Sequence, residues 1–393
     1  MSSFPIVQFM PWCPISREYS AGPIAIIPFE RNNPMDSLGK LDLDIFKKVL
    51  ACYRDLEGHS VKKVAVLCYR GKPLISNLSK KSLRLTAELV ELACFSGLAH
   101  RDYFDSLGPY CNASCFELYA QRLETGRFMA IESRRRGGRS LAFRPIAETV
   151  FSIPEQANSI HAVVVDEGLL AGLVAFRNHV QDGEWARWRD AIACFDQANT
   201  DAQNFRWQVE WILLCSAFQR ILGADSKSIS VAEKFAKALV PSSTVPIGKA
   251  RRKSSCLQKL NPHPLRYGWM EEFYRLRNDF AHGRLQTSKV SAWSQDEHLV
   301  LACIAFPLVI RCLLEQRGQY SFTDNDRVQI DIFEALADRR FLNRPKGAGS
   351  SVDTVWNRLI RRSRMELATR MAASDLERQG FFQKRTKARA LRT

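Results

Sequence analysis

An arginine and a histidine stand close together in the segment YRLRNDFAHGRL, residues 274–285, with four residues between Arg277 and His282. A histidine can move a proton near neutral pH. An arginine can hold a phosphate and stabilise the charge that develops on it in a transition state. Two such groups can cut RNA without a metal ion, so this segment is a candidate active site.

The spacing of the pair does not single it out. The chain has 57 Lys and Arg residues and seven His, so an Arg a few positions ahead of a His is expected by chance. A second pair, Arg54 and His59, occurs in YRDLEGH. Gly58 precedes this histidine, where the predicted helix over residues 43–56 should end. We therefore interpret the second pair as incidental.

The residues around Arg277 predict an amphipathic helix. Apolar side chains recur in steps of three and four and form a core stripe of Trp269, Phe273, Leu276 and Phe280. The side chains off this stripe are Arg275, Arg277, Asn278, Asp279 and His282. Gly283 indicates that the helix ends beside His282, where carbonyl dipoles favour an imidazolium. A straight helix separates Arg277 from His282 by roughly 140°. The helix is therefore distorted, or a second chain completes the site.

The first 178 residues combine strand and helix patterns, which predicts a mixed α/β domain. The predicted strands are Pro23–Pro28 and Lys63–Tyr69, the predicted helices are Leu43–Leu56 and Ser82–Phe95, and a hairpin over Phe128–Phe143 turns at Gly137-Gly138. No phosphate-binding Gly loop or Ser nucleophile motif occurs in this part of the sequence. No catalytic motif is recognised in this part of the sequence, and we expect a sensor or regulatory role for it.

Residues 179–343 show successive amphipathic helices, which predicts an antiparallel helical bundle. The predicted helices carry Trp185 to Phe195, Trp207 to Ile221 before Gly223, Ser230 to Leu239 with a capping box of Ser230 and Glu233, the Arg277 segment, Gln295 to Gln316 kinked at Pro307, and Asp326 to Phe341. The fold class is therefore α+β, with an α/β domain before an all-α domain.

The formal net charge of +16 indicates a polyanionic partner. Residues 344–393 hold thirteen Lys and Arg against four Asp and Glu, a net charge of +9, and they predict a basic extension with helical and flexible parts. A second cluster before the candidate motif supplies candidate RNA contacts at Lys249, Arg251, Arg252 and Lys253. For both clusters a solvated surface is the structural alternative.

The eleven cysteines lie mostly among apolar residues, which is typical of reduced thiols in a cytoplasmic protein. Cys111 and Cys115 are close enough to share a metal, but no second pair or nearby His completes the set, so no metal and no cofactor are predicted. The longest apolar run, Leu299–Ile310, is too short to span a bilayer and contains a proline. The N-terminus lacks the pattern of a signal peptide.

The segment Arg277-Asn278-Asp279-Phe280-Ala281-His282 resembles the signature of HEPN domains: an Arg, a polar residue, and a His after four to six positions on a helix of an α-helical bundle. FDQANTD at residues 195–201 and SAFQRIL at residues 216–222 are similar to segments of the ApeA-like branch of that family. The resemblance covers Trp185 to Gln316 and leaves both ends of the chain unmatched.

The resemblance implies a metal-independent endoribonuclease that works as a homodimer, with two motifs meeting in one RNA-cutting cleft. RNA would be cut by attack of its 2′-hydroxyl, which gives a 2′,3′-cyclic phosphate and a 5′-hydroxyl. His282 would move the proton, Arg277 would hold the phosphate, and Asn278 would orient the substrate or the histidine. The family also implies a role in antiphage defence as a toxin that arrests an infected cell.

The sequence departs from one part of the family at Phe280. HEPN toxins paired with nucleotidyltransferase antitoxins have a Tyr there, which the antitoxin modifies, and Arg275 stands at their matching Arg position. Control by that modification is therefore not expected. Two alternatives stay open. The chain is a non-catalytic nucleic-acid-binding or scaffold protein, or Arg277 and Asp279 are surface ion-pair residues and His282 caps a helix.

Overall fold

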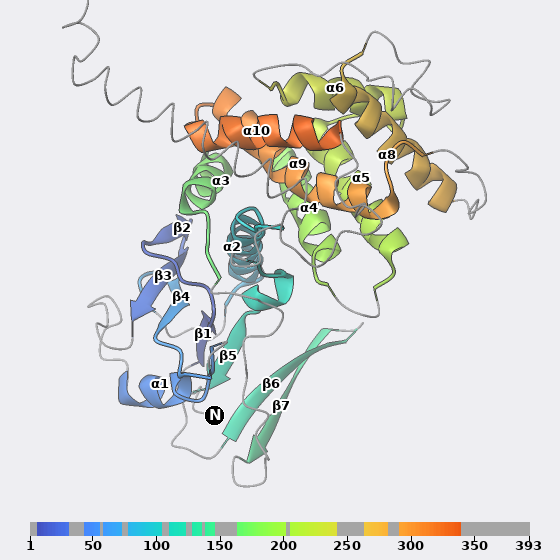
Figure 1. Cartoon of the computed structure of the whole chain (residues 1–393). Coiled ribbons are helices and arrows are strands. Elements are labelled where there is room, and N and C mark those ends of the chain that lie inside the picture. Colours follow the sequence, from blue (N-terminus) through green and yellow to red (C-terminus); the bar gives the residue numbers. More distant parts are fainter. Residues whose placement is uncertain are drawn as a thin grey trace, which may run out of the picture. The chain divides into compact units, whose positions relative to one another are not determined.

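The computed structural model divides the chain into two compact units. Unit 1 comprises Met1–Asp225 with Leu313–Tyr320, and unit 2 comprises Ser226–Cys312 with Ser321–Thr393. The fold is mixed α+β, with an antiparallel sheet followed by helices (Figure 1). The residues that the structure describes are 6–30, 43–55, 58–72, 78–103, 110–122, 128–135, 138–145, 163–201, 205–241, 263–281 and 291–338.

Unit 1 contains a five-stranded sheet in the order β2-β3-β4-β1-β5 (Figure 1). Its strands are β1 (Ile6–Met10), β2 (Tyr19–Ala21), β3 (Ile24–Glu30), β4 (Lys63–Tyr69) and β5 (Tyr119–Arg122). Each described pairing in this sheet is antiparallel. The predicted strands at β3 and β4 are confirmed, and β4 has the predicted bounds. Five consecutive residues of β4 are buried, so both of its faces are covered, and this explains its almost continuous apolar sequence.

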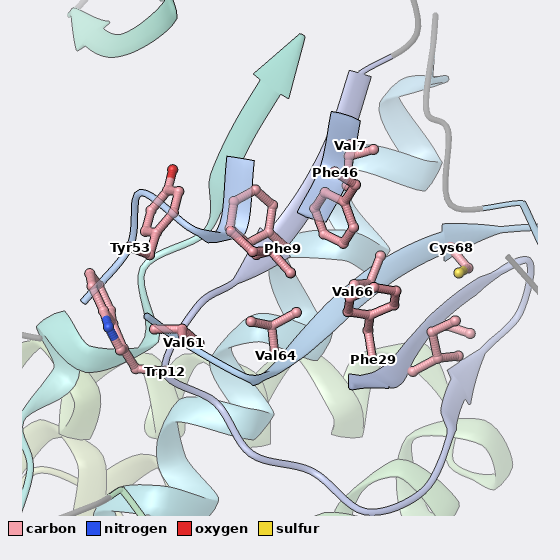
Figure 2. Close-up of a cluster of buried hydrophobic side chains, with 13 residues drawn as sticks. Val7, Phe9, Trp12, Phe29, Phe46, Tyr53, Val61, Val64, Val66 and Cys68 are labelled. Atoms are coloured by element: carbon pink, nitrogen blue, oxygen red, sulfur yellow. The ribbon is translucent and has the colours of Figure 1, made fainter. Parts of the chain in front are cut away.

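One face of this sheet packs against the helix α1 (Leu43–Leu50). Phe46 of α1 makes edge-to-face contacts with Phe9 and Phe29, with ring centroids 5.4 and 5.0 Å apart (Figure 2). All three rings are almost fully buried. The helix was predicted to reach residue 56, but it ends at Leu50 and is followed by a turn.

The long helix α2 (Lys80–Leu98) contacts β3 and extends the predicted helix at both ends. Its apolar face buries Leu85, Leu89 and Leu92, and Ser79 caps its start by accepting a hydrogen bond from the Ser82 N–H. A short 3-10 helix, η2 (Ala113–Phe116), places the Phe116 ring where a β-carbon on the α2 glycine at position 97 would lie 2.0 Å from it. The close approach of η2 therefore requires glycine at that position.

The predicted hairpin is confirmed. Strands β6 (Phe128–Arg135) and β7 (Gly138–Pro145) pair in antiparallel register from Phe128 opposite Pro145 to Arg135 opposite Gly138. Gly138, which was expected in the turn, is the first residue of β7 and pairs with Arg135, and the two residues between the strands lie outside the described residues.

Unit 1 also contains α3 (Glu167–His179), α4 (Asp182–Ala198) and α5 (Trp207–Leu222). The helix α4 packs against both α2 and α5. Gly223 ends α5 in the left-handed conformation, with φ +56°, as its position predicted. The predicted domain boundary between residues 178 and 179 falls near the end of α3, within unit 1.

The described helices of unit 2 are α6 (Ser228–Ala238), α8 (Leu265–Ala281), most of α9 (Gln295–Gln316), and α10 (Asp324–Ala337). Both α6 and α10 pack against α8.

The predicted capping box of Ser230 and Glu233 is wrong. The helix α6 begins two residues earlier, its N-cap is Lys227, and no side chain caps it. A capping box does occur at α10, between Thr323 and Asp326.

The helix α9 has the predicted bounds and contains Pro307. It is the one helix in the described residues that is long and apolar enough to cross a membrane by length and composition alone. However, 72% of the apolar 18-residue window within Gln295–Glu315 is buried inside the chain, which is typical of a core helix in a soluble protein. Arg311 also forms an ion pair from this helix to Asp326, with Nε 3.5 Å from Oδ1. The predicted basic extension, residues 344–393, lies outside the described residues.

Candidate functional site

The candidate residues lie on α8, whose apolar side fixes the helix in unit 2. Trp269 stacks on Phe273, with ring centroids 5.4 Å apart, and contacts Phe235 of α6 and Phe333 of α10 at 5.4 and 5.3 Å. Trp269, Phe273 and Leu276 are buried as predicted, whereas Phe280 is only partly buried. The core stripe therefore packs α8 against α6 and α10, and its burial decreases toward the last turn.

The last described turns of α8 carry four polar side chains that are all partly exposed: Arg275, Arg277, Asn278 and Asp279. We call this set the polar turn. Nη1 of Arg277 donates a hydrogen bond to Oδ1 of Asn278 at 3.0 Å. The guanidinium carbon of Arg277 also lies 5.5 Å from the ring centroid of the buried Tyr274. A cation over an aromatic ring is attracted to it, so Arg277 is oriented by two neighbours on its own helix.

The two arginines of the polar turn retain unused donors. The Nε atoms of Arg275 and Arg277 are covered from solvent, and neither has a hydrogen-bond partner among the described residues. Arg275 lies one turn after Glu271. Burial raises the pKa of Glu271, while the charge of Arg275 and a hydrogen bond from the Ser228 hydroxyl, 3.3 Å away, oppose that rise. The polar turn therefore presents positive charge on partly exposed side chains, while these two Nε donors lie buried and unused.

A buried carboxylate anchors the middle of α8. Oε1 of Glu272 accepts hydrogen bonds from the Ser291 hydroxyl at 2.7 Å, from the N–H groups of Ala292 and Trp293 at 2.9 and 3.3 Å, and from Nε2 of His298 at 3.2 Å. The side chains of Glu272 and His298 are fully buried. Burial acts to raise the pKa of Glu272, but the hydrogen bond and charge of His298 outweigh it, so the pKa is lowered. This network joins α8 to the start of α9.

The structure brings some of the predicted site residues together. Arg277 and Asn278 are hydrogen-bonded neighbours, and Arg275 shares their turn. His282 directly follows the last described residue of α8 and lies outside the described residues, so the angle between Arg277 and His282 stays a prediction. The predicted RNA contacts that also lie outside the described residues are Lys249, Arg251, Arg252 and Lys253.

Arg54 and His59, the second Arg and His pair, form hydrogen bonds in the turn that follows α1. Nη1 of Arg54 donates to the Ala51 carbonyl at 2.9 Å and to the Ser60 hydroxyl. The His59 N–H donates to Oδ1 of Asp55 at 2.9 Å. These bonds close the turn that follows α1, and the guanidinium of Arg54 is directed to that turn.

Two contributors to the site were missed in the sequence. Tyr274 precedes Arg277 by three positions, and this helical spacing is a signal that identifies it as the ring beneath the guanidinium. Glu272 and His298 are separated by 26 residues, and no local pattern indicates their pairing. His298 carries no motif, and its role follows from tertiary structure alone.

No group of three or more His, Cys, Asp or Glu that could hold a metal ion occurs among the described residues. Cys111 and Cys115 are both buried. Burial raises the pKa of the Cys111 thiol to about 12 and also raises that of Cys115.

The segment FDQANTD, residues 195–201, has a structural role in unit 1. Oδ1 of Asn199 accepts a hydrogen bond from Arg101, its Nδ2 donates to the Phe195 carbonyl at 2.7 Å, and its carbonyl accepts from the Ala113 N–H at 2.9 Å. Asn199 thus joins the end of α4 to the residues around η2.

Comparisons with protein-family models, with curated proteins and with solved structures find no match for this chain.

Proposed function

We propose that this chain is a metal-independent endoribonuclease of the HEPN type, which cuts RNA to 2′,3′-cyclic phosphate and 5′-hydroxyl ends. The observation that carries the proposal is the setting of Arg277. Its guanidinium lies over Tyr274 and is bonded to Asn278, while its Nε has no acceptor in the described residues. A pre-oriented and partly exposed guanidinium is suited to a phosphate.

In this proposal Arg277 stabilises the negative charge that develops on the phosphate during attack by the 2′-hydroxyl. His282, five residues later, removes the proton from that hydroxyl and returns one to the leaving 5′-oxygen. Asn278 keeps Arg277 in place through the 3.0 Å hydrogen bond. The reaction needs no metal, because the arginine supplies the charge stabilisation and the histidine supplies the proton transfer.

The proposal includes a homodimer, because one straight helix separates Arg277 and His282 by roughly 140°. Two copies of α8 facing each other would let the His282 of one chain act with the Arg277 of the other. Arg275 and the basic residues Lys249, Arg251, Arg252 and Lys253 would hold the RNA backbone. The cell context we propose is a cytoplasmic antiphage effector of the ApeA-like kind, with residues 1–178 as its regulatory part.

The test is an RNA-cleavage assay with the purified full-length chain, tRNA and a structured RNA, in excess chelator. We expect cleavage products that end in a 2′,3′-cyclic phosphate. The variants Arg277→Ala and His282→Ala should each lower the cleavage rate by about 100-fold or more, which is the typical effect of losing one transition-state contact.

The matched control is His59→Ala, because His59 also follows an arginine by five positions and its side chain is exposed. This variant should cleave RNA at the wild-type rate. RNA binding without cleavage by the wild type, unchanged in the Arg277 and His282 variants, would instead support the non-catalytic nucleic-acid-binding or scaffold protein. Cleavage that chelator abolishes would contradict the proposed mechanism.

A further inference from the structure

Two carboxyl groups on neighbouring helices of unit 1, one on a buried residue and one on a partly buried residue, have buried oxygens that accept no hydrogen bond of normal geometry from the described residues. Glu91 belongs to α2 and Asp196 to α4, and these helices pack against each other. Asp196 is 8% exposed, and neither of its carboxylate oxygens accepts a hydrogen bond of normal geometry. Oε2 of Glu91 is also buried without a partner. An unpaired buried charge is costly, so these groups need another way to remain inside the protein.

Arg189 acts electrostatically on Glu91 and Arg101 acts on Asp196, but each arginine also serves other acceptors. Arg189 of α4 forms ion pairs with Glu88 at 3.5 Å and with Asp190 at 3.0 Å. Arg101, just after α2, donates to Asn199 and to the carbonyl oxygens of Leu98 and Cys111. The other titratable groups that act on the pair are acids and thiols, namely Glu88, Cys94 and Asp190. No described cation is therefore dedicated to neutralising either carboxylate.

The electrostatic balance favours protonation. Burial raises the pKa of Glu91 to about 7, with Glu88 and Asp190 adding to the rise and Arg189 opposing it. Burial and the neighbouring Glu91 raise the pKa of Asp196 well above its ordinary range, although the weak thiol donor of Cys94 and the charge of Arg101 oppose them. Two carboxylates in one low-dielectric site cannot both be ionised without a large cost.

We propose that Glu91 and Asp196 are held between α2 and α4 in protonated form, and that loss of the proton from this pair loosens unit 1. The pair would make unit 1 a pH-sensitive element, because α2 contacts the sheet through β3 and α4 packs against α5. The inference is independent of RNA cleavage.

The sign of the pH effect follows from the raised pKa. Glu91 has a folded-state pKa of about 7 against an ordinary 4.5, so its contribution to stability is complete below 4.5 and is lost as pH rises through 7. Between pH 4.5 and 7 each pH unit lowers the folding equilibrium constant by up to about tenfold, whereas above pH 7 Glu91 adds no further loss and a continued fall comes from Asp196. Urea unfolding of the full-length chain between pH 6 and 8.5 should therefore show a falling midpoint.

The variants Glu91→Gln and Asp196→Asn imitate the protonated groups and should remove part or all of this fall. The matched control is Asp182→Asn, an exposed carboxylate on the same helix as Asp196, which should keep the wild-type pH profile. Hydrogen exchange of peptides from α2 and α4, corrected for the intrinsic effect of pH, should rise with pH in the wild type and in Asp182→Asn more than in the amide variants.

A second measurement keeps the inference open to refutation if an amide variant fails to fold. The infrared band of a protonated carboxyl group should be present in the wild-type chain at pH 6 and should weaken as pH approaches 8.5. Absence of that band at pH 6, or a wild-type stability that does not change between pH 6 and 8.5, would overturn the inference.

Discussion

Two charged residues on the same helix, Glu272 and Arg277, have opposite hydrogen-bond environments. Glu272 is fully buried and one of its oxygens accepts four hydrogen bonds. Arg277 is partly exposed, makes one described hydrogen bond, and keeps its Nε without a described acceptor. Glu272 is therefore saturated by neighbours that hold the fold, whereas Arg277 is partly exposed and, under the proposed function, is the group that contacts a phosphate.

Unit 1 contains a second saturated carboxylate, Glu88 of α2. Nε of Arg177 lies 2.8 Å from its Oε2, and Trp185 Nε1 donates to the same oxygen at 3.1 Å. Arg84 and Arg189 approach its Oε1 at 3.1 and 3.5 Å. Burial would raise the pKa of Glu88, but the Arg177 interaction and the other donors outweigh it and lower the pKa. Both units therefore keep a buried carboxylate ionised by surrounding it with donors.

The largest effect expected from this comparison is at Glu272. The change Glu272→Ala removes one member of a buried pair and leaves His298 and the N–H groups of Ala292 and Trp293 without their acceptor. Breaking a buried charge pair typically costs about 3–5 kcal/mol. Urea unfolding of the full-length chain should show a loss of unfolding free energy of that order. The loss should arise in unit 2, which contains Glu272 and its partners.

The control for Glu272 is Glu233→Ala on α6, where the side chain is exposed. This change should alter the free energy of unfolding by no more than about 0.5 kcal/mol. Equal losses of unfolding free energy in the two variants would show that the donors around Glu272 do not contribute to stability. The different hydrogen-bond environments of Glu272 and Arg277 would then have no effect on the energy of the fold.

Local patterns in the sequence predicted much of the framework. The bounds of β4 and α9 were found from apolar runs, and the end of α5 was found from Gly223, because each signal lies within the element itself. The start of α6 was misplaced, since Ser230 and Glu233 match a capping box but the helix begins at Ser228. A short motif does not determine which of several nearby polar residues begins a helix.

Contacts between distant segments could not be predicted. The position of β1 between β4 and β5 depends on strand pairing across long separations. The ion pair of Glu88 and Arg177 joins residues 89 positions apart. Arg277 and Asn278 were found because their signal is local, whereas the Glu272 network and the Glu91 and Asp196 pair become visible when the helices are packed together.

A smaller effect is expected when the charge of Arg277 is kept and its shape is changed. In Arg277→Lys the planar fork is lost, so the phosphate is no longer held by parallel donors. The RNA-cleavage rate should fall at least about tenfold, which corresponds to about 1.4 kcal/mol of transition-state stabilisation. The free energy of unfolding should change by less than about 0.5 kcal/mol, since the side chain is partly exposed. A large loss of stability with unchanged cleavage would reverse the assignment and make Arg277 a structural charge.

The smallest effect is expected at the exposed edge of the Glu88 network. The Arg84 side chain is 59% exposed, whereas the Arg177 side chain is 19% exposed, and both donate to Glu88. Because solvent screens an exposed pair, Arg84→Met should cost less than about 1 kcal/mol of unfolding free energy. Arg177→Met should cost more, since the remaining donors must then neutralise a carboxylate that is 2% exposed. Urea unfolding of the two variants at neutral pH separates these outcomes. Equal losses of unfolding free energy in the two variants would mean that the number of donors around Glu88 matters and that their burial does not. The comparison between Glu272 and Arg277 would then rest on the number of hydrogen-bond partners alone.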